Sequence, residues 1–163
     1  MTLAAAEDVD IANGTAVIRI SATGIPSKDI TASEEDNDTL QFVTNVDTVS
    51  VPEGGTAQFQ VRLSAQPSGD VSVTVARVSG DTDITVQSGA ALTFTPANWN
   101  TNQAVTLAAA EDVDIANGTA VIRLSATGIP SRDITATEQD NDTLQFVTDV
   151  DSLTVPEGGT AQF

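Results

Sequence analysis

Acidic residues of this sequence gather in short groups between apolar runs. The densest group, residues 111–114, holds three carboxylates in four positions and directly follows an apolar run over 104–110. A second group, residues 140–142, places two carboxylates around an asparagine. Carboxylates packed this closely repel one another unless a cation lies between them. The spacing therefore predicts a site for a hard cation.

Other acids of the same unit stand at turns between predicted strands. One lies in the Val-Pro-Glu-Gly-Gly segment at 51–55, and two lie in Gly-Asp-Thr-Asp-Ile at 80–84. Loops from alternate turns of a β-sandwich meet at one end, so we expect these segments to converge. The predicted metal ligands are eight side chains: Glu53, Asp81, Asp83, Glu111, Asp112, Asp114, Asp140 and Asp142.

The residue types on offer indicate which metal would bind. The sequence contains no Cys and no His, which removes the usual ligands of zinc and copper. Carboxylates, amides and carbonyls remain, and these are ligands of Ca²⁺ and Mg²⁺. We expect Ca²⁺ ahead of Mg²⁺ because many protein oxygens are available. Paired carboxylates can also cleave glycosidic bonds, but no nucleophile motif or evident cleft accompanies them, so we do not expect an enzyme.

Two simpler interpretations of the acids are solvated turn residues and a halophile-type acidic surface. Both would scatter acids along the outer faces of strands. Here the exposed strand positions are mostly Thr, Ser, Gln and Arg, and the acids cluster at loops. The distribution favours cation binding.

Overall charge narrows the range of partners. The chain of 163 residues has 23 acidic against 6 basic residues and a formal net charge of −17. Such a surface repels nucleic acid and anionic membranes, so we expect neither as a partner. No apolar stretch approaches the roughly 20 residues of a membrane span. Hydrophobic residues make up 40% of the chain, which predicts a packed core rather than a disordered acidic tail.

Alternation of apolar and polar residues predicts short β-strands. Turn residues separate the runs, and no window has a helical period. About seven strands in roughly 100 residues are typical of an antiparallel immunoglobulin-like β-sandwich, which makes the fold class all-β. Trp99 is expected to pack at one end of the sandwich, with sugar stacking as the alternative. The clearest runs lie at 57–63, 71–75, 92–95, 105–109, 120–126 and 134–136.

The chain also repeats itself. Residues 2–59 align without gaps to 106–163, an offset of 104 residues, and differ at only eight positions. Repeats of this length predict a tandem array of domains, whose neighbouring repeats are partners. We place a complete repeat at 40–143, the C-terminal half of a preceding repeat at 1–39, and the start of the next at 144–163, with a fresh strand at 144–147. Domain-swapped self-association is an expected outcome, because the chain carries two C-terminal halves of the repeat and only one complete N-terminal half.

The order of these motifs resembles the Calx-beta domain family. That family includes calcium-sensing domains of sodium–calcium exchangers and repeats of large bacterial surface proteins. The resemblance covers the complete repeat and, by repetition, both flanking segments. Its motifs are Val-Pro-Glu-Gly-Gly at 51–55, Gly-Asp-Thr-Asp-Ile at 80–84, Leu-Thr-Phe-Thr-Pro-Ala-Asn-Trp at 92–99, Glu-Asp-Val-Asp at 111–114 and Asp-Asn-Asp at 140–142.

The resemblance implies calcium at one end of the sandwich, held by the same eight residues, with Asp81 or Asp83 as the ligand of its turn. The family often has further glutamates where this chain has Ala-Asn-Gly-Thr at 116–119, so one or two ions are expected. The expected function is a calcium-rigidified spacer or adhesion repeat of a large extracellular or cell-surface bacterial protein. The alternative is an accessory, carbohydrate-binding module of a secreted polysaccharide-degrading enzyme.

Overall fold

The computed structural model describes residues 1–162, and its regular structure is β throughout. Within these residues there is no helix, and therefore none able to cross a membrane. The strands are β1 (Thr15–Ala22), β2 (Ile25–Ser33), β3 (Phe42–Thr44), β4 (Thr48–Pro52), β5 (Thr56–Leu63), β6 (Val71–Gly80), β7 (Ile84–Ser88), β8 (Ala91–Phe94), β9 (Gln103–Ala109), β10 (Thr119–Ala126) and β11 (Ile129–Gln139).

Strands β3 to β11 form two sheets that enclose one hydrophobic core. One sheet has the order β4-β11-β10-β6-β8 and the other has the order β3-β5-β9-β7. Alternate residues point inward, as the pattern of the sequence predicts. Phe59, Phe94, Leu107 and Ile122 are fully buried between the sheets. The chain is therefore a β-sandwich over the predicted complete repeat.

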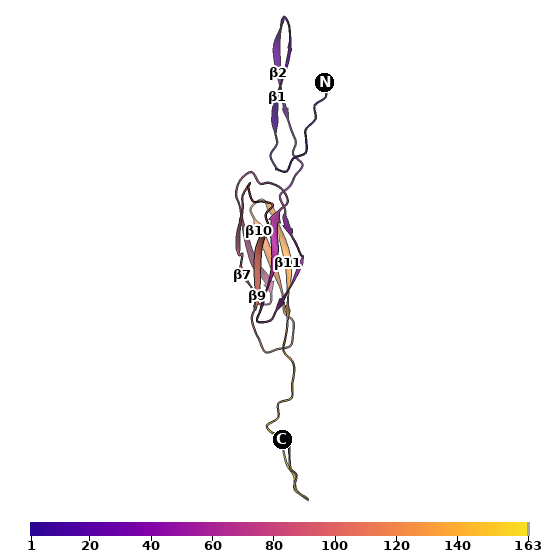
Figure 1. The fold of residues 1–163 in the computed structure, drawn as a ribbon, viewed down its shortest axis with the longest axis vertical. Helices are drawn as coiled ribbons and strands as arrows, with labels where there is room; N and C mark the ends of the chain where they lie inside the picture. Colours follow the sequence, from indigo (N-terminus) through magenta and orange to yellow (C-terminus); the bar gives the residue numbers. More distant parts are fainter. Residues whose placement is uncertain (163) are drawn as a thin grey trace.

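The flanking segments lie at opposite ends of an elongated molecule (Figure 1). Hairpin β1–β2 projects from one end, and residues 144–162, which form no strand, leave the other. Hairpin β1–β2 has the register of β10–β11: Thr15 pairs with Ser33 as Thr119 pairs with Thr137. Two nearly identical sequences thus form hairpins with the same register.

Three expectations about the strands need correction. The two sheets hold nine strands rather than about seven, because β4 and β7 have only five residues each and their apolar alternation is too short to stand out. The sandwich is not purely antiparallel, since β4 pairs with β11 in parallel. The strand expected at 144–147 is absent. Its counterpart β3 pairs with β5, and residues 144–147 pair with no strand among the described residues.

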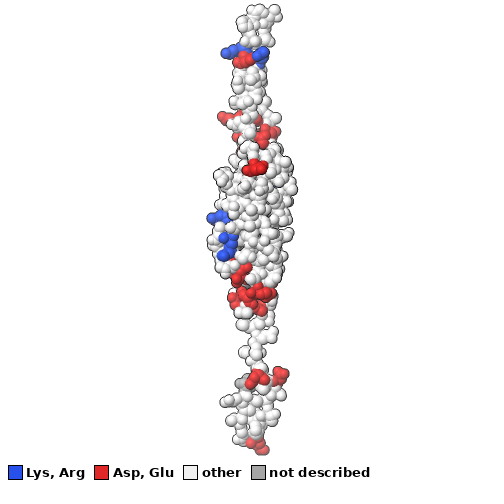
Figure 2. Space-filling view, turned by 90° about the vertical axis from the view of Figure 1, so that its left-hand side faces the viewer, with Lys and Arg blue, Asp and Glu red and all other residues white. Residues whose placement is uncertain are grey.

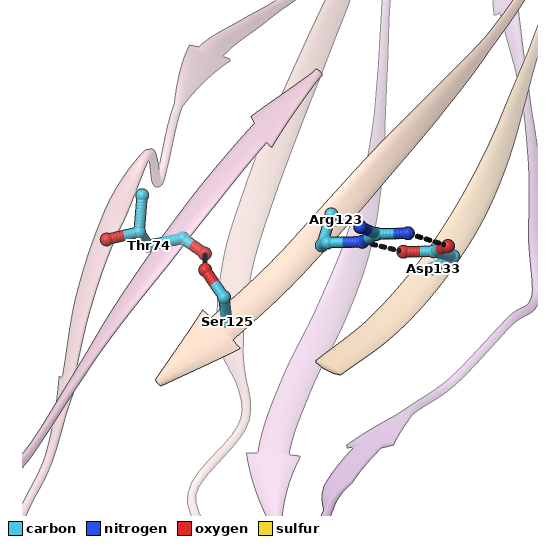
Figure 3. Close-up of polar contacts among 4 residues, drawn as sticks. All are labelled: Thr74, Arg123, Ser125 and Asp133. Atoms are coloured by element: carbon cyan, nitrogen blue, oxygen red, sulfur yellow. Dashed lines mark hydrogen bonds and ion pairs between the residues drawn. The ribbon is translucent and has the colours of Figure 1, made fainter. Parts of the chain in front are cut away.

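Polar contacts join the outer faces of neighbouring strands (Figure 3). Arg123 on β10 donates two hydrogen bonds to the carboxylate of Asp133 on β11, at 2.7 and 2.8 Å. Ser125 Oγ lies 3.5 Å from the carbonyl oxygen of Thr74 on β6. Trp99 is half-buried against the core, and its carbonyl accepts the N–H of Leu63 at 2.8 Å, so its predicted packing role is confirmed.

Candidate metal centre

The parallel pairing of β4 and β11 positions the first part of the site. In this pair Pro52 lies opposite Gln139, so both strands end at the same edge of the sandwich. The next residues, Glu53 and Asp140, leave the sheet side by side. The backbone N–H of Glu53 donates to the carbonyl of Gln139 at 3.0 Å and fixes this arrangement.

The side chain of Glu53 connects two acidic loops that are distant in the sequence. It is 6% exposed. Its Oε1 accepts the N–H of Asp112 at 2.7 Å, and its Oε2 accepts the N–H of Asn141 at 3.1 Å. Glu53, Asp112 and Asp140 each present a carboxylate oxygen within 4.8 Å of the other two. The structure therefore brings three of the predicted ligands together.

A fourth carboxylate, Glu138, was not among the predicted ligands. It is 1% exposed and occupies an inward position of β11. Its Oε2 accepts the N–H of Gly118 at 3.3 Å, and its Oε1 has no hydrogen-bond partner. Burial raises the pKa of this carboxyl, and repulsion from Asp81, Asp112 and Glu53 raises it further. A buried carboxylate oxygen without a donor is costly unless a cation or a proton satisfies it.

Gly118 allows two of these carboxylates to approach each other. A Cβ atom at this position would lie 1.7 Å from Asp81 Oδ2 and 3.0 Å from Glu138 Oε2. The absence of a side chain therefore leaves space that both carboxylates occupy. The N–H of Asp81 donates to the carbonyl of Thr119 at 2.7 Å, which holds the end of β6 against the start of β10.

The Asp-x-Asp spacing has a local structural cause. In each pair, Oδ1 of the first aspartate accepts the N–H of the second and closes a tight turn. The other oxygen of the first aspartate is not used by this turn. The three turns have N···O distances of 2.9, 2.8 and 2.8 Å, for Asp81 with Asp83, Asp112 with Asp114 and Asp140 with Asp142.

The other predicted ligands surround this group. A Cβ on Gly54 would lie 2.1 Å from Glu111 Oε1, so Glu111 lies across the turn that carries Glu53. Loss of hydration raises the pKa of Asp142, followed by repulsion from acids that include Glu53 and Asp140. The carboxylate of Asp114 accepts the N–H of Ala116 at 2.7 Å, which orients it within its own loop. Within residues 1–162, the side chain of Asp83 makes no ion pair.

No basic side chain compensates these carboxylates among the described residues. The ion pairs there are Arg19–Asp29, Arg123–Asp133 and Arg132–Asp47, and none includes a predicted ligand. Figure 2 shows acidic residues gathered at the end of the sandwich from which residues 144–162 leave, with Lys and Arg elsewhere. This oxygen-rich, uncompensated group suits a hard divalent cation.

A second acidic group lies at the base of hairpin β1–β2. Asp8, Asp10 and Asp36 also present oxygens within 4.8 Å of one another. They are the counterparts of Asp112, Asp114 and Asp140 at the offset of 104 residues. The counterpart of Glu138 here is Glu34, which is not buried.

Comparison with known proteins adds little. No family model and no curated protein matches this chain. Among solved structures, a Bacteroides ovatus GH5 xyloglucanase in complex with a XXXG heptasaccharide is similar at 14% sequence identity, with a TM-score of 0.44. The match covers 72% of this chain and 21% of that chain.

Proposed function

We propose that residues 40–143 form a calcium-binding structural repeat. In this proposal the domain is an immunoglobulin-like sandwich of the Calx-beta type, and it belongs to a tandem array with a period of 104 residues. The parent is a large extracellular or cell-surface bacterial protein, in which the repeat acts as a spacer or adhesion module. The sequence resemblance and the acidic end of the sandwich support this assignment.

The observation that carries the cation proposal is the unpartnered Oε1 of Glu138. Surface acids are common without any ligand, but a fully buried carboxylate beside Asp81, Asp112 and Glu53 is not. The residues available to hold a cation are Glu53, Asp112 and Asp140, with Glu138 and Asp81 on the inner side. All offer oxygen, which fits Ca²⁺.

A cation bound here would join segments from several parts of the chain. The turn after β4, the loop after β9 and the end of β11 all contribute a carboxylate. Because the unfolded chain does not hold these carboxylates together, binding stabilises the folded state by RT ln(1 + [L]/Kd), about 2.7 kcal/mol at 100 times Kd. Millimolar calcium outside cells would keep even a weak site occupied.

Thermal unfolding with EDTA, with millimolar CaCl₂ and with MgCl₂ tests the proposal. We expect calcium to raise the melting temperature of the sandwich more than magnesium does. Glu53→Gln should reduce this rise because it removes a charge from the centre of the group. Asp70→Asn provides a matched control. It removes one exposed carboxylate just before the start of β6, and the site lies at the other end of that strand. An unchanged melting temperature in calcium would refute the cation site.

The alternative of a carbohydrate-binding module has no specific support. Trp99 would have to present its face as a platform for a sugar ring, and it packs instead against the core. We therefore propose the calcium-binding repeat alone.

A further inference from the structure

The turn after β5 contacts the chain on both sides of hairpin β1–β2. This receiving turn consists of residues 64–66, which directly follow Leu63, the last residue of β5. One segment that it contacts is the loop at 9–11, before β1. The other is the connecting segment at 39–41, after β2. The base of the hairpin is therefore attached to the sandwich at two places.

The first attachment is a strand-like contact between two backbones. Asp10 and Gln66 form a parallel β-bridge, in which the N–H of Gln66 donates to the carbonyl of Val9 at 2.7 Å. The side chain of Gln66 points the other way and donates from Nε2 to the carbonyl of Pro96 at 2.8 Å. Gln66 is thus anchored within the sandwich while its backbone binds the loop.

The second attachment is made by one serine. Ser64 Oγ accepts the N–H of Gln41 and donates to the carbonyl of Thr39, both at 2.8 Å. The backbone N–H of Ser64 also donates to the carbonyl of Gln41 at 3.0 Å. Between these residues, Leu40 is partly buried against the hydrophobic core. The connecting segment is therefore bound to the sandwich along its length, unlike a free linker.

An apolar side chain of the loop is covered at the same junction. Ile11 is half-buried and lines a hollow of about 540 Å³ together with Leu40 and Pro130. Ile115 occupies the same position of an identical loop sequence and is 52% exposed. Because the local sequences are the same, the cover of Ile11 comes from its surroundings at the junction.

We propose that the receiving turn at 64–66 is the docking site for the acidic loop of the preceding repeat, and that neighbouring repeats meet there in a fixed joint. The inference rests on the proposed tandem array. The complete repeat carries both parts of the joint, since its loop at 113–115 has the sequence of 9–11. That loop follows β9, and the receiving turn lies at the far end of β5 from Glu53.

The position of these two parts determines how repeats join. Because the loop and the receiving turn are different surfaces at opposite ends of the sandwich, the contact is head-to-tail and continues along an open array. Two attachments on either side of the hairpin base also resist bending that a single connecting segment would permit. Their donors and acceptors are backbone groups and one hydroxyl, so the joint does not require a cation.

Residual dipolar couplings of the full chain test the joint. They are measured in EDTA for backbone amides of hairpin β1–β2 and of the sandwich. We expect one alignment tensor to fit both sets, because a fixed joint makes them a single rigid body. Couplings of the hairpin that require a weaker tensor, or that fit none, would overturn the joint. A missing effect of calcium on the melting temperature would refute the cation site and leave this result unchanged.

Matched variants identify the contacts responsible. Ile11→Ser removes the apolar contact at the junction and should weaken the alignment of the hairpin relative to that of the sandwich. Ile115→Ser makes the same change in the identical loop after β9 and should leave the common tensor intact. Equal tensors in the two variants would contradict the docking of the loop.

The second attachment has a control in its own turn. Ser64→Ala removes the hydroxyl that bridges Thr39 and Gln41, and it should also weaken the alignment of the hairpin. Ser68→Ala removes another exposed hydroxyl a few residues along the chain and should not. Ser64 is exposed, so both variants should keep the melting temperature of the sandwich. A hairpin aligned as in the wild type in both Ile11→Ser and Ser64→Ala would refute the two-point joint.

Discussion

Glu53 and Asp112 are 59 positions apart, and the carboxylate of the first accepts the backbone N–H of the second at 2.7 Å. This contact holds the acidic loop after β9 against the turn after β4. The carboxylates of this group repel one another. Hydrogen bonds from backbone N–H groups to Glu53 oppose that repulsion and keep the loops together. The proposed cation site is therefore partly preorganised by these hydrogen bonds.

Glu53→Ala should destabilise the protein even in EDTA. Two backbone donors, the N–H groups of Asp112 and Asn141, would lose their acceptor. Asp112 is half-buried and Asn141 is exposed, so each lost hydrogen bond should cost about 1 kcal/mol or less. Chemical denaturation would measure the loss, and amide hydrogen exchange at residues 112 and 141 should accelerate. Exchange as slow as in the wild type at both positions would show that the two hydrogen bonds do not hold the loops.

Glu138→Gln should have opposite effects without and with calcium. In EDTA the amide removes a buried charge that faces Asp81, Asp112 and Glu53, so stability should rise by about 1 kcal/mol. In calcium the same change removes a ligand, so the shift in melting temperature should shrink. The two conditions are compared by thermal unfolding of the same sample. A variant that is equally destabilised in both conditions would indicate a purely structural role for Glu138.

Gly118→Ala tests the crowding at the inner side of the site. The new Cβ would clash with Asp81 Oδ2 and crowd Glu138, so one carboxylate must move. We expect a loss of stability of about 1–3 kcal/mol, which is typical of overpacking, and weaker calcium binding by titration calorimetry. Gly69→Ala is the control, because a Cβ at that position meets nothing within 4 Å. Similar stability and affinity in the two variants would refute the crowding.

The Arg123–Asp133 pair predicts a dependence on pH. The hydrogen bonds from Arg123 hold the pKa of Asp133 below its usual value. Its contribution to stability is therefore present above the pKa of the unfolded chain and is lost as the pH falls through the lower folded value. Asp133→Asn should cause a small loss of stability at neutral pH that disappears in acid, because exposed pairs contribute little.

The hairpin β1–β2 supplies the control for this pH experiment. Asp29 and Arg19 make the same pair there, outside the sandwich. Asp29→Asn removes the same charge from the same sequence context. It should leave the main unfolding transition of the sandwich unchanged at every pH. A loss equal to that of Asp133→Asn would mean that net charge, rather than the local pair, sets the effect.

Much of the fold was predictable because strands with one buried face alternate clearly. Val73 and Val75 in β6, for example, are both 2% exposed and mark the inner face of a central strand. Strand β4 was not predicted, since it has five residues and ends in proline. Its parallel pairing with β11 depends on a contact between the two ends of the unit, which no local pattern encodes.

Sequence patterns predicted the acidic loops, and the structure brings Glu53, Asp112 and Asp140 together. Their role as metal ligands stays a prediction. Glu138 was missed because the apolar alternation seemed to end at Ala136. Continuing the period of two would have placed a glutamate at an inward position. A carboxylate at a predicted inward position of a strand is unusual, and this signal could have identified Glu138 as part of the site.

The parallel pairing of β4 and β11 also determines how the domain responds to tension. The chain enters the sandwich at one end and leaves at the other (Figure 1). A force that pulls on the two ends therefore draws β4 and β11 past each other along their length. Five paired positions, from Thr48 opposite Thr135 to Pro52 opposite Gln139, bear this load together. Strands β4 and β11 thus act as a mechanical clamp, with the carboxylates of Glu53 and Asp140 just beyond its end.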